Sequence, residues 1–294
     1  MSTKIKGLCF ASLAMLGGGL YAIPYRWSLE NIEPLVVVWG VFLWAFFFSL
    51  PGAWLARNQN KFSWKIAKNS IAISLMGILG NYSICKALSQ DSPTLLVLVS
   101  RSEIIIAILL SWIFLKELVN LRVWITVVII VFGIIVMKLD ALSFNLKDWS
   151  SFIWAVTSAF SFASMQVVSK GIIKEINPQL LNVLRLAFAL AILWSLSEVR
   201  IGVFNITMSE WKWLALAAFF GPFIGRIFYT YALRYLSISK AVIIGSFSPV
   251  ITFLFELAAF GTMISIFEGL GGTIMIAGIL WFFIPGLKQN RIND

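Results

Sequence analysis

The chain contains no histidine and only two cysteines among its 294 residues. Histidine is the commonest general base and metal ligand, and no HExxH, GxSxG or paired intramembrane aspartate motif occurs in its place. These absences argue against an intramembrane enzyme. Cys9 and Cys85 lie in separate apolar runs and form neither a metal-type cluster nor a pairing framework. We therefore expect buried free thiols, no metal and no cofactor.

Charge is also scarce, because charged residues make up 12% of the chain and hydrophobic residues 60%. The mean hydropathy is +0.92, whereas about a quarter of the residues in a soluble domain are charged. Apolar runs close to the length that crosses a bilayer recur along the whole sequence. The net charge of +10 lies in the short loops between these runs, which indicates membrane orientation rather than a nucleic-acid partner. The composition predicts an all-α polytopic membrane protein.

Ten transmembrane helices are predicted from the apolar runs and their polar or Pro-containing borders. The predicted spans are 7–25, 34–56, 68–88, 93–115, 121–139, 150–170, 179–198, 211–233, 240–260 and 267–285. The first run lacks a small-residue cleavage site, so we expect a retained helix rather than a signal peptide. The connections are short and contain no GxxxxGK[ST] loop, which argues against ATP-driven pumping.

Lysine and arginine divide unequally between the two sets of loops. Fourteen lie in the set that includes the N-terminus: Lys4, Lys6, Arg57, Lys61, Lys65, Lys68, Lys116, Arg122, Lys170, Lys174, Arg234, Lys240, Lys288 and Arg291. Five lie in the opposite set: Arg26, Lys138, Lys147, Arg200 and Lys212. Because cytoplasmic loops carry the excess of cations, both termini are expected on the cytoplasmic side of a plasma membrane, as in the inner membrane of a bacterium.

The sequence repeats with an offset of about 145 residues. This offset aligns Gly80 with Gly225, Val97 with Val242 and Gly133-Ile134 with Gly278-Ile279, and Pro34 matches Pro178 one residue short of it. Five helices per half is an odd number, so the second half enters the membrane from the opposite side. The sequence thus predicts two inverted five-helix repeats, 1–140 and 141–294, an architecture of secondary transporters with the substrate site between the halves.

Motifs in both halves resemble the EamA-type family of the drug/metabolite transporter superfamily, and the resemblance covers nearly the whole chain. The second half carries Tyr231-Ala232-Leu233, then Ser246-Phe247-Ser248-Pro249-Val250, then Gly278. The first half carries Ala87-Leu88, then Phe114-Leu115-Lys116-Glu117, then Gly133-Ile134, while Arg185 follows Pro178. Three positions depart from the pattern: Ile104 replaces a proline, Thr262 stands opposite Glu117, and Val41 stands opposite Arg185.

What the resemblance implies is a ten-helix carrier that works by alternating access. Its central cavity would be lined mainly by the first, third, fourth, sixth, eighth and ninth helices. The cargo of such proteins ranges over amino acids, nucleotide-like metabolites, drugs and other small solutes, so the resemblance implies no single substrate.

Six charged residues inside the predicted spans are candidates for a functional role, because a charge at a helix centre costs roughly 2.5–3.5 kcal/mol unless it gains a partner or a wet cavity. Arg101 and Glu103 lie near the middle of the fourth helix and are two residues apart, so they point to different faces. We predict that at least one binds substrate, and Arg226 is weighed equally as a site residue and a structural one. Arg185, Lys86 and Glu256 are expected to form gating or structural ion pairs.

Uncharged polar residues complete the candidate substrate site. Asn81 is the repeat counterpart of Arg226, and Ser246 and Ser248 are the counterparts of Arg101 and Glu103. Polar positions thus recur at matching depths, as a site on a pseudo-two-fold axis requires. The remaining candidates are Ser158, Gln166 and Tyr229. Hydroxyl groups in such helices also bond to neighbouring backbone carbonyls, so a packing role stays open for each serine.

The sequence therefore favours a secondary transporter for an amino acid or a related zwitterionic or anionic metabolite. The alternatives are a multidrug or aromatic-compound exporter of the same fold, a channel and a membrane scaffold. The expected partners are a small-molecule substrate, the lipid bilayer and a coupling ion or exchange solute. Both a monomer and a homodimer fit the sequence.

Overall fold

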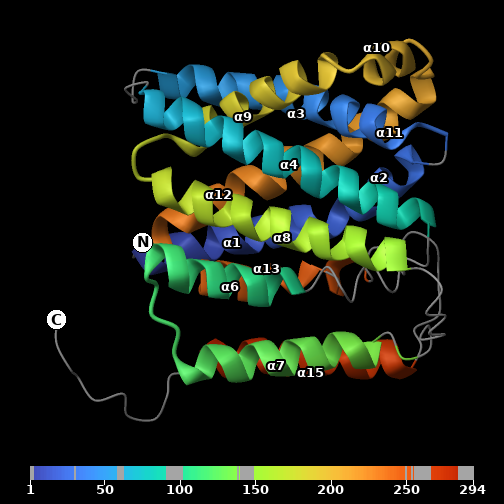
Figure 1. The fold of residues 1–294 in the computed structure, drawn as a ribbon. Helices are drawn as coiled ribbons and strands as arrows, with labels where there is room; N and C mark the ends of the chain where they lie inside the picture. Colours follow the sequence, from blue (N-terminus) through green and yellow to red (C-terminus); the bar gives the residue numbers. More distant parts are fainter. Residues whose placement is uncertain are drawn as a thin grey trace.

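The computed structural model describes residues 3–29, 31–57, 63–90, 102–137, 139, 149–248, 250–252, 254 and 266–283. Every regular element among them is a helix, and the helices run roughly side by side in one bundle (Figure 1). Their bounds are α1 Thr3–Leu20, α2 Ala22–Ser28, α3 Pro34–Ala56, α4 Trp64–Gln90, α6 Ser102–Leu115, α7 Leu121–Met137, α8 Trp149–Ile172, α9 Pro178–Trp194, α10 Ser197–Val203, α11 Met208–Ala218, η3 Phe219–Gly225, α12 Arg226–Tyr235, α13 Ile238–Gly245 and α15 Ile266–Phe283.

The helix starts follow from local sequence. α3 and α9 both begin with proline, which suits the first helical position because its missing N–H has no intrahelical partner there. At α9 the Asn177 side chain also accepts a hydrogen bond from the Gln179 N–H at 3.0 Å. α11 begins with a capping box between Thr207 and Glu210.

The two repeats are inverted, as predicted, because equivalent helices run in opposite directions where they pair. Near the start of α7, Arg122 Nε donates a hydrogen bond of 3.2 Å to the Trp281 carbonyl oxygen near the end of α15. α3 and α9 also run antiparallel, since Ser49 meets Asn182 at one end and the Trp39 and Trp194 rings lie 5.2 Å apart at the other. Figure 1 shows α7 and α15 together at one edge of the bundle.

Three predicted spans depart from a uniform α-helix. The first divides at Tyr21 into α1 and α2. The seventh ends at Trp194, and the chain bends by 97° into α10. The eighth contains the π-helical segment η3 around Pro222, which has no N–H to continue an α-helical ladder.

Four helices among the described residues are long and apolar enough to cross a membrane, or five if the bent pair α9 and α10 counts as one span. Four shorter apolar helices accompany them. The all-helical, two-repeat membrane fold is therefore confirmed. The count of ten spans and the repeat boundary at residue 140, which lies outside the described residues, stay predictions.

Two apolar clusters hold the bundle together on either side of its centre. One joins α6, α7, α8, α12, α13 and α15 through residues such as Ile108, Ile130 and Ile243. The other joins α2, α3, α4, α9, α10 and α11 through residues such as Phe42 and Leu214.

The prediction that both thiols are buried is wrong for Cys9. Its side chain is exposed on α1, whereas Cys85 is buried and lies 3.2 Å from the Tyr25 hydroxyl. An apolar run in a membrane helix includes the residues that face lipid, so hydrophobicity alone does not place a residue in the protein interior.

Consecutive glycines let α1 approach its neighbours closely. A Cβ atom at Gly17 would lie 2.6 Å from the Phe220 carbonyl oxygen, and one at Gly19 would lie 2.6 Å from the Ile251 Cβ. At Gly18 the nearest atom would be the Ser248 Cβ at 3.8 Å. Gly17 and Gly19 are therefore packing residues, and only Gly18 has room for a side chain.

We predict that Gly17→Ala lowers the free energy of unfolding by about 1–3 kcal/mol, because backbone atoms of η3 must move away. Gly171→Ala is the matched control, since nothing lies within 4 Å of the position that its Cβ would take. The measurement is equilibrium unfolding in mixed micelles. Equal stability of the two variants would show that the approach of α1 to η3 is not tight.

Candidate functional site

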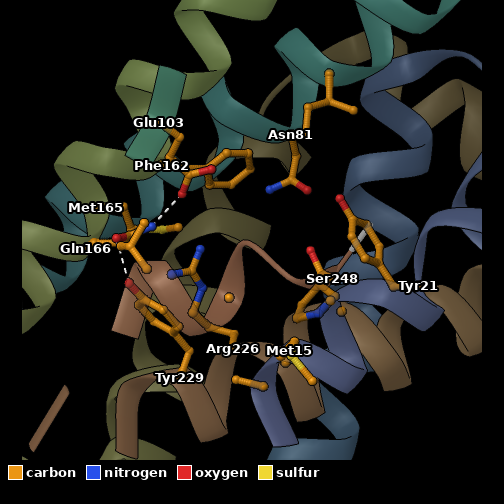
Figure 2. A pocket seen from close by; sticks show the side chains of 18 of the residues that line it. Met15, Tyr21, Asn81, Glu103, Phe162, Met165, Gln166, Arg226, Tyr229 and Ser248 are labelled. Carbon is orange, nitrogen blue, oxygen red and sulfur yellow. Dashed lines mark hydrogen bonds between the residues drawn. The ribbon is translucent and has the colours of Figure 1, made fainter. Parts of the chain in front are cut away.

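A cavity of about 290 Å³ lies in the centre of the bundle. The helices that line it are α1, α4, α6, α8, α12 and α13, together with η3, Phe42 of α3 and Arg185 of α9. Figure 2 shows side chains from both repeats pointing into this space. The cavity is thus built by the six helices that the family resemblance implies, with additions from the second and seventh spans.

Most of the predicted substrate-site residues meet in this cavity. Those that line it are Asn81, Glu103, Ser158, Gln166, Arg226, Tyr229, Ser246 and Ser248. Arg101, predicted beside them, lies outside the described residues. The positions come from both repeats, so the matching depths seen in the sequence correspond to one shared space.

A chain of hydrogen bonds connects three of these residues across three helices. The Tyr229 hydroxyl on α12 donates to Gln166 Oε1 on α8 over 2.7 Å. Gln166 Nε2 in turn donates to Glu103 Oε1 on α6 (Figure 2). Because Tyr229 occupies the oxygen of the Gln166 amide, the amide nitrogen faces Glu103. The relay fixes the carboxylate at the cavity wall.

Arg226 presents its guanidinium to the same cavity. Its Cζ lies 5.9 Å from the centre of the Tyr229 ring and 6.0 Å from that of Phe162. No hydrogen bond joins this guanidinium to any side chain or carbonyl within the described ranges, although Glu103 acts on it electrostatically. Arg226 directly follows the π-helical segment, which turns the start of α12 toward the cavity. Several N–H donors are thus available to a bound anion.

Arg185 is buried and lines the cavity from α9. The ion pair predicted for it does not form with any carboxylate that the structure describes. Its Nε donates to Asn182 Oδ1 over 2.8 Å, and its Nη2 donates to the Pro222 carbonyl over 3.2 Å. Uncharged dipoles stabilise the cation in place of an acid, since the π-helical segment brings the Pro222 carbonyl within reach.

With two arginines and one glutamate, the described cavity lining carries a formal net charge of +1. Arg226 also repels Arg185 electrostatically. A negatively charged group in the cavity would relieve this repulsion, which favours a ligand that carries a carboxylate or phosphate.

The uncharged polar residues differ in how far the protein satisfies them. Ser246 donates to the Ile243 carbonyl over 2.6 Å, which fits the packing role left open for the serines. The Ser158 hydroxyl is buried and has no hydrogen-bond partner in the described part of the chain. Asn81 donates to the Gly77 carbonyl over 2.8 Å. Ser158 is therefore a lining serine whose hydroxyl the described protein leaves unsatisfied.

Apolar and aromatic lining residues were not predicted from the sequence. They include Met15, Tyr21, Phe42, Phe162 and Met165. The repeat register contained a signal for one of them, because Tyr21 stands 145 residues before Gln166 and is its counterpart. The others resemble ordinary apolar residues of membrane helices, and only packing selects them.

Two further predicted residues lie away from this lining or outside the described residues. The Lys86 ammonium lies 5.6 Å from the centre of the Tyr82 ring, and Lys86 is not among the residues that line the cavity. Glu256 lies outside the described residues. Their predicted ion-pair roles stay predictions.

Comparison with known proteins agrees with this geometry. The model of the EamA-like transporter family matches residues 5–139 and 149–284, one match for each repeat. The chain belongs to the EamA-like transporter family. It is therefore an integral membrane protein. A transporter of this family sits in a lipid bilayer and binds a small-molecule substrate.

Solved structures support the fold of this EamA-like transporter, and 28 of their chains match it. One similar structure, titled only as the crystal structure of a protein, gives a TM-score of 0.74 at 17% sequence identity. The alignment covers 96% of each chain. No curated protein matches the sequence. At this identity the likeness concerns the fold alone.

We predict that Tyr229 and Gln166 are energetically coupled. A double-mutant cycle of Tyr229→Phe and Gln166→Leu should give a coupling energy of about 0.6–1.5 kcal/mol, because each single change breaks the same hydrogen bond. Unfolding in mixed micelles measures it. Tyr82→Phe replaces Tyr229→Phe in the control cycle, because Tyr82 does not line the cavity and should be additive with Gln166→Leu. Additivity in both cycles would contradict the relay.

Proposed function

We propose that the protein carries a small zwitterionic or anionic metabolite, such as an amino acid, across the plasma membrane by alternating access. One observation carries the proposal: Arg226 and Glu103, of opposite charge, line the same cavity between the inverted repeats. A carboxylate pairs with the first and an ammonium with the second. The absence of a nucleotide-binding motif from the sequence favours secondary transport.

Arg226 is the proposed carboxylate anchor. An arginine fork matches a carboxylate in a two-point hydrogen bond, and the described protein leaves this guanidinium without an acceptor. Arg185 supplies a second, fixed positive charge at the cavity wall. We assign Arg185 the role of raising the local potential rather than of binding, because its described hydrogen bonds go to Asn182 and Pro222.

Glu103 is the proposed ammonium anchor, held in place by Gln166 and Tyr229. Gln166 holds the carboxylate through Oε1, and we assign this carboxylate at the cavity wall to a substrate ammonium. The aromatic rings of Tyr21 and Phe162 in the same lining can stabilise a cation further through their π faces. Asn81 and Ser158 add polar contacts for the substrate backbone.

Cavity size favours a metabolite over a drug-sized molecule. The volume of about 290 Å³ lies just below the range of about 300–1,000 Å³ that is typical of ligand pockets. The aromatic and methionine lining is the feature that favours the second candidate, an exporter of aromatic compounds. The fixed Glu103 and the net positive lining favour the zwitterion.

Orientation follows from charge. The end of the bundle where α1 begins also carries Lys65, Lys170, Lys174 and Arg234. We place this end, with both termini, on the cytoplasmic side, because cations accumulate in cytoplasmic loops.

The test measures binding of the twenty amino acids by thermal shift, then of the best binder and its deamino and amide analogues by calorimetry. Arg226→Gln should lower the binding affinity for the amino acid and for the deamino analogue by roughly 10- to 100-fold, because a charge-assisted hydrogen bond of about 1.5–3 kcal/mol is lost. Glu103→Gln should lower the affinity for the amino acid by a similar factor and leave the affinity for the deamino analogue unchanged. Counterflow in proteoliposomes then tests transport.

Arg200→Gln is the control, because Arg200 is exposed on α10 outside the cavity lining. It should bind the amino acid as the unchanged protein does. Stabilisation by a planar aromatic cation and by no amino acid would favour the aromatic-compound exporter instead. If each analogue bound Arg226→Gln and Glu103→Gln with the same affinity, the two-anchor site would be ruled out.

A further inference from the structure

Polar contacts tie cavity-lining helices together at the end of the bundle where α1 begins. Three charged residues make these contacts: Glu117, which follows α6, Lys170 of α8 and Arg234 of α12. We call these three residues the latch. None of them lines the cavity as described, so substrate binding does not account for them.

Lys170 closes the end of α12. Its ammonium donates to the carbonyls of Leu233 and Leu236, where α12 ends. The last carbonyls of a helix have no intrahelical partner and carry the negative end of its dipole. A cation there is therefore stabilised both by hydrogen bonds and by the dipole.

Arg234 makes the reciprocal contact from α12 to the turn that directly follows α8. Its Nε donates to the Ile173 carbonyl over 3.1 Å, and its Nη2 donates to the Ile176 carbonyl over 2.7 Å. Each of the two helices thus caps the other with a cation. α8 and α12 also carry Gln166, Arg226 and Tyr229 of the cavity wall.

Glu117 joins α13 to this pair. Its Oε2 accepts the Ile238 N–H over 2.9 Å at the start of α13, where a carboxylate favours the helix dipole. The same carboxylate lies 4.0 Å from the Lys170 ammonium. The Glu117 and Lys170 side chains are only 15% and 17% exposed, so solvent screens the pair far less than the Lys65–Glu175 pair nearby, which is 43–59% exposed.

α1 completes the closure at the same end. A Cβ atom at Gly7 would lie 2.8 Å from both the Tyr235 Cβ and the Leu236 Cγ. Leu236 is the residue whose carbonyl Lys170 holds. The helices α1, α6, α8, α12 and α13 therefore converge on one short segment, 233–238.

The repeat makes the latch asymmetric. The counterparts of Lys170, Arg234 and Glu117 at the opposite end, 145 residues away, are Tyr25, Ser89 and Thr262, none of which is charged. Tyr25 instead contacts Cys85. The three charged residues of the latch are therefore not repeated in the other half of the chain.

We propose that the latch is the gate that closes the cavity on the side where α1 begins, and that the transport cycle must break it to open that side. The proposal rests on the alternating-access function proposed above. Because the latch contacts are formed in this structure, we expect the α1 side to be closed when no substrate is bound.

The experiment measures the distance between two spin labels at this end, placed on Leu118→Cys and Lys174→Cys, by double electron–electron resonance in nanodiscs. Both positions are exposed at this end, and the background carries Cys9→Ser and Cys85→Ala. In Lys170→Gln and in Arg234→Gln, the fraction of molecules at a longer distance should be severalfold larger than in the parent protein. Lys170→Arg, which keeps the charge, should restore most of the short distance.

Lys68→Gln is the matched control, because it removes an exposed cation at the same end, and no described residue bonds to its side chain. Its distances should match those of the parent. Distances in Lys170→Gln and Arg234→Gln that also match the parent would overturn the gate. Each variant is measured on its monodisperse fraction, and two independent latch positions guard against one that fails to fold. The measurement needs no substrate, so it stands if the proposed cargo is wrong.

Discussion

Charge buried inside a lipid-facing bundle is the constraint on which this structure depends. The described lining holds two arginines and a glutamate at depths where no water is available from the bilayer. Each must be satisfied by the protein, by its opposite charge or by a cavity. Arg185 is satisfied by uncharged dipoles and Glu103 by an amide, while Arg226 is left to the cavity. The division of roles among the three charges follows from this difference.

Backbone irregularity is what makes that arrangement reachable. Pro222 interrupts the eighth span, and the resulting π-helical turn both frees a carbonyl for Arg185 and places Arg226 at the start of a new helix. Gly17 lets α1 pack directly against this turn, so the irregular backbone is covered by protein. Non-helical backbone at membrane depth is tolerated under just these conditions, when it is buried or lines a cavity.

The cavity and the latch use the same helices for different purposes. α8 and α12 carry Gln166, Arg226 and Tyr229 at the cavity and Lys170 and Arg234 at the end where α1 begins. On the proposed mechanism, a rearrangement at either place would be transmitted along these helices to the other. That coupling is what a carrier needs, because a site in the centre must be sensed at the ends if only one end is to open at a time.

The sequence by itself determined the class of fold and most of the polar cavity wall. Hydrophobic length, loop charge and the 145-residue register are local or additive properties, and they sufficed to select residues such as Gln166, Tyr229 and Arg226. Tertiary structure decided which partner each group takes. Arg185 looked like one half of an ion pair, but the described protein gives it a carbonyl that only the π-helical turn exposes. Cys9 looked buried, since an apolar run does not say which face meets lipid. The reciprocal caps of Lys170 and Arg234 join residues more than 55 positions apart, and no periodicity along the chain records which helix ends will meet.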